Sequence, residues 1–190
     1  MTHALFTAFT APVTREVEPL LIPGPVPGNP VALRQFRYIE EWQQFILSLR
    51  LSGHPPQEIQ RHYERMLRVL YLAWLDASVI KLAELAALAS LEGTIKWRYQ
   101  PKQFKGLAAA LKHLVTDAGV RDSDLRVVRE CGGAVISNLL RSSPPDPASL
   151  SEIRNRLAHG SPFELSPWGG LFEVVRDLID FMYPQPESDS

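Results

Sequence analysis

Apolar residues recur at intervals of three and four along most of the chain, a spacing that is typical of amphipathic helices. The first such run predicts a helix over residues 30–51, with Asn29 as its N-cap and Pro30 at the first helical position. The same spacing predicts further helices at residues 57–76, 79–98, 107–119, 122–139, 149–159 and 171–182. Strand-like alternation is absent, so we expect an all-α fold, an antiparallel helical bundle.

Two of these boundaries depend on helix-breaking signals. Gly and Pro do not occur between Gln57 and Leu91, yet one helix running on to Arg98 would be about 63 Å long, too long for this domain. We therefore expect a break near Asp76 or Ser78, which are both good N-caps. In the later segment 122–139, the adjacent glycines at 132–133 interrupt the helical pattern.

The segment from residue 79 is rich in small residues, which suits a central helix packed closely on several neighbours. Its predicted buried stripe consists of Val79, Leu82, Leu85, Ala86 and Ala89.

The chain is expected to form one domain, residues 30–183, between an N-terminal arm and a short tail. The arm, residues 1–29, contains five prolines and two glycines, which disfavour a helix and favour extended or turn structure. Its Leu20, Leu21 and Ile22 could still pack across the bundle or against a partner. Residues 184–190 are polar and are predicted to be a disordered tail.

Composition is ordinary for a soluble globular protein, with 45% hydrophobic and 22% charged residues among 190. A net charge of −1 provides no global field to attract nucleic acid, so RNA binding would need a local basic patch. The single Cys131 fits a reducing cytosol, and no signal-peptide pattern opens the chain. Charged residues interrupt the most apolar run, 69–91, so we predict a cytoplasmic protein without a membrane span.

The most informative stretch is SLSEIRNRLAHG, residues 149–160. Ser149 and Glu152 have the spacing of a capping box, and Gly160 predicts a helix end at about His159. Ile153 and Leu157 would form the buried stripe, which leaves a polar set outside it: Arg154, Asn155 and His159. Asn155 and His159 share a helix face, whereas Arg154 and His159 are roughly 140° apart around the axis.

Arg154, Asn155 and His159 resemble the R-[N/D/H]-x(3–5)-H signature of HEPN domains (higher eukaryotes and prokaryotes nucleotide-binding), α-helical bundles of which many are metal-independent ribonucleases. A second similarity is ALASLEGTIKWRY, residues 87–99, since many HEPN-like chains carry such a helix before the motif helix. The two similarities span roughly residues 76–183. HEPN toxins that are paired with nucleotidyltransferases often have a Tyr two places after the His, where this chain has Ser161.

The resemblance implies cleavage of RNA to a 2′,3′-cyclic phosphate, without a cofactor, in a cleft between the two protomers of a homodimer. His159 would move protons and Arg154 would hold the phosphate, with Asn155 in support. It also implies a toxin or phage-defence setting, with RNA and a cognate antitoxin or another protein as partners. The alternative is a catalytically silent binding or dimerisation module, in which Arg154 pairs with Glu152, Glu164 or Asp146 and His159 caps the helix end.

Two further groups are candidates. Glu92 could approach the motif as a second-shell residue that tunes His159, or could form a helix-surface ion pair. A basic and aromatic cluster could track an RNA strand or be a solvated helix end: Lys96, Arg98, Lys102 and Lys105 with Trp97, Tyr99 and Phe104. Two pairs have metal-ligand spacing, Glu58 with His62 and His113 with Asp117, but neither has a third ligand, so no metal site is predicted.

Overall fold

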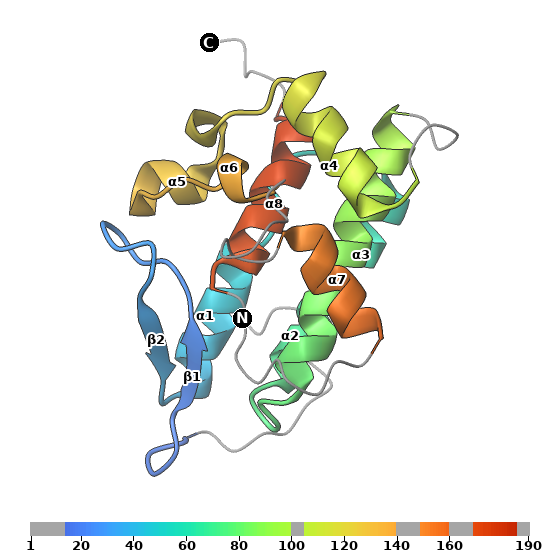
Figure 1. The fold of residues 1–190 in the computed structure, drawn as a ribbon. Coiled ribbons are helices and arrows are strands. Elements are labelled where there is room, and N and C mark those ends of the chain that lie inside the picture. Colours follow the sequence, from blue (N-terminus) through green and yellow to red (C-terminus); the bar gives the residue numbers. More distant parts are fainter. Residues whose placement is uncertain (1–13, 100–104, 140–148, 160–168, 186–190) are drawn as a thin grey trace.

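A computed structural model describes residues 14–99, 105–139, 149–159 and 169–185 (Figure 1). The chain is mostly helical with one small sheet, so the broad all-α prediction is confirmed apart from that sheet. In chain order the elements are β1 (Leu20–Pro23), β2 (Leu33–Phe36), α1 (Ile39–Ser48), α2 (Gln57–Leu72), α3 (Val79–Tyr99), α4 (Leu107–Thr116), the 3-10 turn η1 (Asp122–Asp124), α5 (Arg126–Cys131), α6 (Ile136–Leu139), α7 (Leu150–Ala158) and α8 (Leu171–Met182).

The sheet is an antiparallel hairpin in which Leu20 pairs with Phe36 and Pro23 pairs with Leu33. The predicted helix over 30–51 is therefore wrong in its first part, and so is the prediction that strands are absent. The helix begins at Ile39 instead, where the Glu41 carboxylate accepts the backbone N–H groups of Arg37 and Tyr38 at 2.8 and 3.2 Å.

The turn of the hairpin lies within the arm predicted from its prolines. Val26 and Asn29 exchange backbone hydrogen bonds of 2.9 and 2.8 Å across Pro27 and Gly28. Gly28 has a φ of 75°, a left-handed conformation that glycine adopts at little cost. A Pro-Gly pair is a known turn signal, and here it forms the turn of the hairpin. The helical spacing of the apolar residues that follow predicts a helix instead of the second strand. Residues 1–13 of the predicted arm lie outside the described residues.

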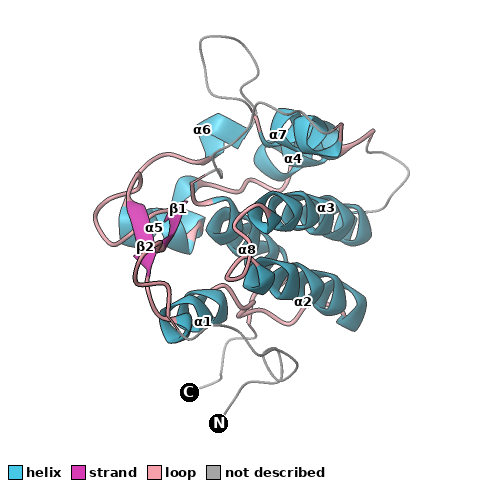
Figure 2. Cartoon of the chain, turned by 90° about the horizontal axis from the view of Figure 1, so that it is seen from below, coloured by secondary structure: helices cyan, strands magenta, loops and turns pink. Residues whose placement is uncertain are grey.

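Helix α3 lies at the centre of the molecule and packs against α2, α8, α7 and α4 (Figure 2). The predicted break before it is confirmed, since the Asp76 carboxylate accepts the Ser78 backbone N–H at 2.9 Å and the helix starts at Val79. The predicted buried stripe is wrong, because Leu82 is 61% exposed while Ile80, Ala83 and Leu91 are buried. Apolar and small residues of α3 occur on most of its faces. The neighbouring helices, rather than the hydrophobic periodicity, therefore determine which face is buried.

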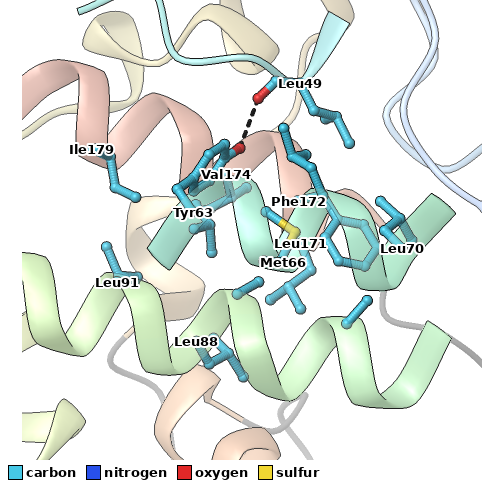
Figure 3. Close-up of a cluster of buried hydrophobic side chains, with 14 of the residues drawn as sticks. Leu49, Tyr63, Met66, Leu70, Leu88, Leu91, Leu171, Phe172, Val174 and Ile179 are labelled. Atoms are coloured by element: carbon cyan, nitrogen blue, oxygen red, sulfur yellow. Dashed lines mark hydrogen bonds between the residues drawn. The ribbon is translucent and has the colours of Figure 1, made fainter. Parts of the chain in front are cut away.

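The main core lies where α2, α3 and α8 meet, with Leu49 from the segment after α1 (Figure 3). Side chains from these helices gather there: Tyr63, Met66 and Leu70 of α2, Leu88 and Leu91 of α3, and Leu171, Phe172, Val174 and Ile179 of α8. Leu20, Ile22 and Phe36 of the hairpin are buried in the same core, as the apolar part of the arm allowed.

The other predicted helices appear with small changes. Those at 57, 107, 149 and 171 begin within a residue of their predicted starts. The segment predicted as one interrupted helix, 122–139, is divided into η1, α5 and α6, and Gly132 and Gly133 between α5 and α6 both have positive φ. At the start of the predicted tail, the Gln185 side chain donates to the Ser52 carbonyl at 2.6 Å; residues 186–190 lie outside the described residues. In the described part of the chain, no helix combines the length and apolarity that a membrane crossing requires.

Candidate functional site

Helix α7 has the local structure that its sequence predicts. The Glu152 backbone N–H donates to the Ser149 hydroxyl at 3.3 Å, and the Ser149 N–H donates to the Glu152 carboxylate at 2.9 Å, so the capping box is confirmed. The helix ends at Ala158 with His159 as its C-cap. Leu150 and Ile153 are buried and Leu157 is half-buried on the side that packs against α3. The polar residues of the motif are therefore turned towards solvent.

A single carboxylate joins the motif helix to the central helix. Glu92 of α3 is 8% exposed, and one of its oxygens lies 2.6 Å from the Lys96 ammonium. Its other oxygen lies 3.5 Å from the Arg154 guanidinium of α7. Two cations share one carboxylate, which leaves this group with one net positive charge. Glu92 does approach the motif, and it does so through Arg154.

The motif residues differ in how far they are open to solvent. The Arg154 side chain is 37% exposed, and its guanidinium also donates to the Asn155 side-chain oxygen at 3.2 Å. Asn155 and His159 are exposed. The His159 backbone N–H donates to the Asn155 carbonyl at 3.0 Å, so these two residues lie one helical turn apart at the end of α7. An anion that approaches Arg154 would meet the arginine fork beside the Asn155 amide, and the His159 imidazole lies one turn beyond Asn155 at the helix end.

Of the partners that the sequence suggested for Arg154, only Glu152 lies among the described residues, and it is not the partner found. Glu152 is used in the capping box, and Arg154 is paired with Glu92. Glu164 and Asp146 lie outside the described residues. The pair Glu92–Arg154 joins residues of two helices, and the i,i+4 pair Glu92–Lys96 lies within α3, so both a surface ion pair and a link to the motif are present.

The predicted basic cluster is divided by the fold. Lys96 lies at the motif, whereas Arg98 lies over the rings of Tyr99 and Tyr183, at 5.6 and 6.0 Å. Lys105 is exposed just before α4, and Lys102 and Phe104 lie outside the described residues. The structure thus brings Lys96 together with Arg154 and places Arg98 towards the end of α8.

Neither pair with metal-ligand spacing gains a third ligand among the described residues, which contain no group of three His, Cys, Asp or Glu side chains suited to a metal ion. His113 and Asp117 are instead hydrogen-bonded to each other at 2.8 Å. Sequence reasoning missed that His62 and Arg65 border a groove between α2 and α3, beside Trp97. The available signal was the run of small residues in this segment, which includes Ala89 and Gly93.

Comparison with known proteins gives no relative for this arrangement: no family model matches the chain, and neither a curated protein nor a solved structure is significantly similar to it.

Proposed function

We propose that this chain is a HEPN-like, metal-independent endoribonuclease of the cytoplasm, of the toxin or phage-defence type. The observation that carries the proposal is the surface position of the R-N-x-x-x-H motif, with Arg154 and Lys96 held together by the buried carboxylate of Glu92. Asn155, which accepts a hydrogen bond from Arg154, and His159 are both exposed on the same helix. A phosphate-binding cation next to a titratable imidazole is what metal-free RNA cleavage requires.

The chemistry follows from these groups. The ribose 2′-oxygen attacks the neighbouring phosphorus while its proton passes to the His159 imidazole. The bond from phosphorus to the 5′-oxygen then breaks, and that oxygen takes a proton from an imidazolium, which leaves a 2′,3′-cyclic phosphate. Arg154 stabilises the charge that develops on the phosphoryl oxygens, and Asn155 orients the phosphate or the imidazole.

We also propose that the active form is a homodimer. Arg154 and His159 are five residues apart, so a regular helix directs them roughly 140° apart around its axis. A twofold arrangement of two α7 helices would place Arg154 of one copy beside His159 of the other. Two imidazoles would then meet at one phosphate, one accepting the proton of the 2′-OH and the other supplying the leaving oxygen.

One observation favours the alternative, a catalytically silent binding or dimerisation module. Arg154 is already paired with a buried carboxylate, as a structural motif would require. Two features weigh against it: the Arg154 side chain keeps 37% of its surface exposed, and His159 is exposed at the helix end.

The test is cleavage of a mixed RNA pool by the purified protein in EDTA. We expect His159→Ala to lower the rate roughly 10²- to 10⁴-fold and Arg154→Ala roughly 10²- to 10³-fold. Arg68→Ala, an exposed arginine of α2 outside the motif, is the matched control and should cleave like the wild type. All variants must first show wild-type helicity and oligomeric state.

Three outcomes would count against the proposal. Cleavage that survives in both motif variants would assign the activity to a contaminant or another site. Absence of cleavage by the wild type, together with reduced stability of both variants, would identify the motif as structural. A strictly monomeric but active protein would overturn the homodimer.

A further inference from the structure

A groove of about 520 Å³ runs between α2 and α3, and every described residue that lines it belongs to one of these two helices. Its floor is apolar, formed by Ile59 and Met66 of α2 and by small residues of α3. Trp97 lies at one end, and His62 and Arg65 are on the α2 rim with one carboxylate, Glu58. The groove therefore combines an apolar floor with an aromatic end wall and a polar rim on which Arg65 is the cation.

Trp97 is unusual among the described tryptophans. Trp42 and Trp74 are buried in the core, whereas Trp97 is 59% exposed. It also borders a second hollow, whose lining includes His54, Arg98 and Tyr183. An exposed indole that borders one hollow with Arg65 and another with Arg98 is suited to an unpaired base whose flanking phosphates need positive partners.

The groove is next to the candidate site. Lys96, which is paired with Glu92, immediately precedes Trp97 in α3. Figure 2 shows α3 lying between α7, which carries Arg154, and α2, which forms the far wall of the groove. The surface of α3 between these two sides carries Ala89 and Gly93, and a Cβ added at Gly93 would meet nothing within 4 Å. A chain can cross α3 there close to its backbone.

We propose that this groove binds one unpaired base of single-stranded RNA, stacked on Trp97, next to the phosphate held by Arg154 and Lys96. The inference rests on the proposed ribonuclease function and names its substrate as single-stranded. A base within a double helix is already stacked on both faces, so only an unpaired base can enter the groove and cover the indole. Arg65 and His62 would contact the adjoining phosphates along the α2 rim.

The test is the affinity of the full chain for a short fluorescent RNA whose 2′-oxygens are methylated, so that it binds without being cleaved. Trp97→Ala should weaken binding roughly 5- to 150-fold, and Trp97→Phe should recover most of the loss. Leu82→Ala, an equally exposed apolar residue of the same helix outside the groove, should bind like the wild type. An RNA of the same length without bases should bind wild type and Trp97→Ala equally.

The other results each overturn the inference. Equal binding by wild type and Trp97→Ala, with RNA cleavage intact, would remove the groove from the substrate site and leave the ribonuclease proposal standing. Failure of the wild type to bind or cleave any RNA would remove both. If Trp97→Ala instead changes the molar mass measured by light scattering, the groove holds a second copy of the chain rather than a base.

Discussion

Two charged clusters in this molecule each contain an arginine–carboxylate pair, but one pair is buried and the other is open to solvent. In α8, Arg176 and Asp177 are only 3 and 4% exposed, and their side chains are 2.6 Å apart. Arg176 also donates to the Ser48 carbonyl at 3.0 Å, and Asp177 accepts the Val127 backbone N–H at 2.7 Å. This cluster ties α8 to the end of α1 and to the start of α5.

The cluster at α7 has the same kind of ion pair but a different setting. Arg154 meets Glu92 at 3.5 Å and keeps over a third of its side chain exposed. An arginine–carboxylate pair by itself therefore does not indicate whether a cluster is structural or binds a ligand. Burial and the number of backbone groups that depend on the pair distinguish a structural cluster from one that is open to a ligand.

The largest expected effect is the loss of Asp177. Asp177→Ala should lower the free energy of unfolding by about 3–5 kcal/mol, because it leaves a buried guanidinium without its carboxylate and the Val127 N–H without its acceptor. Urea unfolding measures this. Asp117→Ala is the control, since Asp117 is an exposed carboxylate paired with His113, and it should cost less than about 1 kcal/mol. Equal losses of unfolding free energy in Asp177→Ala and Asp117→Ala would show that burial of the ion pair makes no difference to stability.

A pH effect is expected at Glu173, a buried neighbour of that cluster. Burial raises the pKa of the Glu173 carboxyl above its ordinary value of 4.5, although the nearby Arg34 guanidinium lowers it. Arg34 lies 3.3 Å away, yet Glu173 Oε1 forms no hydrogen bond among the described residues. Between pH 4.5 and the raised folded pKa, the folded state therefore holds a proton that the unfolded chain has lost, so stability falls as the pH rises through this range.

Glu173→Gln should remove this decline, which for one proton is at most about 1.4 kcal/mol per pH unit. Unfolding free energies of wild type and variant at several pH values above 4.5 check the prediction. A wild type whose stability rises across that range, relative to the variant, would show that the Arg34 pairing outweighs burial.

A smaller effect is expected at Tyr63, whose buried hydroxyl donates to the Leu49 carbonyl at 2.7 Å (Figure 3). Tyr63→Phe should cost about 1 kcal/mol, the usual net value of one hydrogen bond. Burial also raises the pKa of the Tyr63 hydroxyl, so this group should not titrate in alkali until the protein unfolds. Tyr38→Phe, at an exposed tyrosine, is the matched substitution and should leave stability unchanged within error.

The smallest effect on stability is expected at the motif itself. Arg154→Met should change the free energy of unfolding by no more than about 1 kcal/mol, because a solvent-screened ion pair contributes little. The same variant should lose RNA cleavage under the proposed function. A loss of stability close to that of Asp177→Ala would instead show that the Arg154–Glu92 pair is structural, like the pair in α8.

The residues of the candidate site could be predicted from the sequence, but their contacts with other helices could not. The capping box and the Gly after His159 predicted where α7 starts and ends, and so which side chains face outward. The pairing of Arg154 with Glu92 joins residues that are 62 positions apart, and no local spacing encodes that distance. The groove beside Trp97 likewise forms only where α2 and α3 pack together, so it could not be predicted from either segment alone.

The sequence by itself determined the helices whose ends carry their own signals, such as α2, α3, α7 and α8. These signals act within a turn or two of helix, so folding elsewhere does not alter them. The tertiary structure decided that Leu33 and Phe36 pair with the arm in a hairpin and that α3 turns Leu82 outward. Both choices depend on contacts with distant segments, and burial of the shared core outweighs the weak local preference for a longer helix.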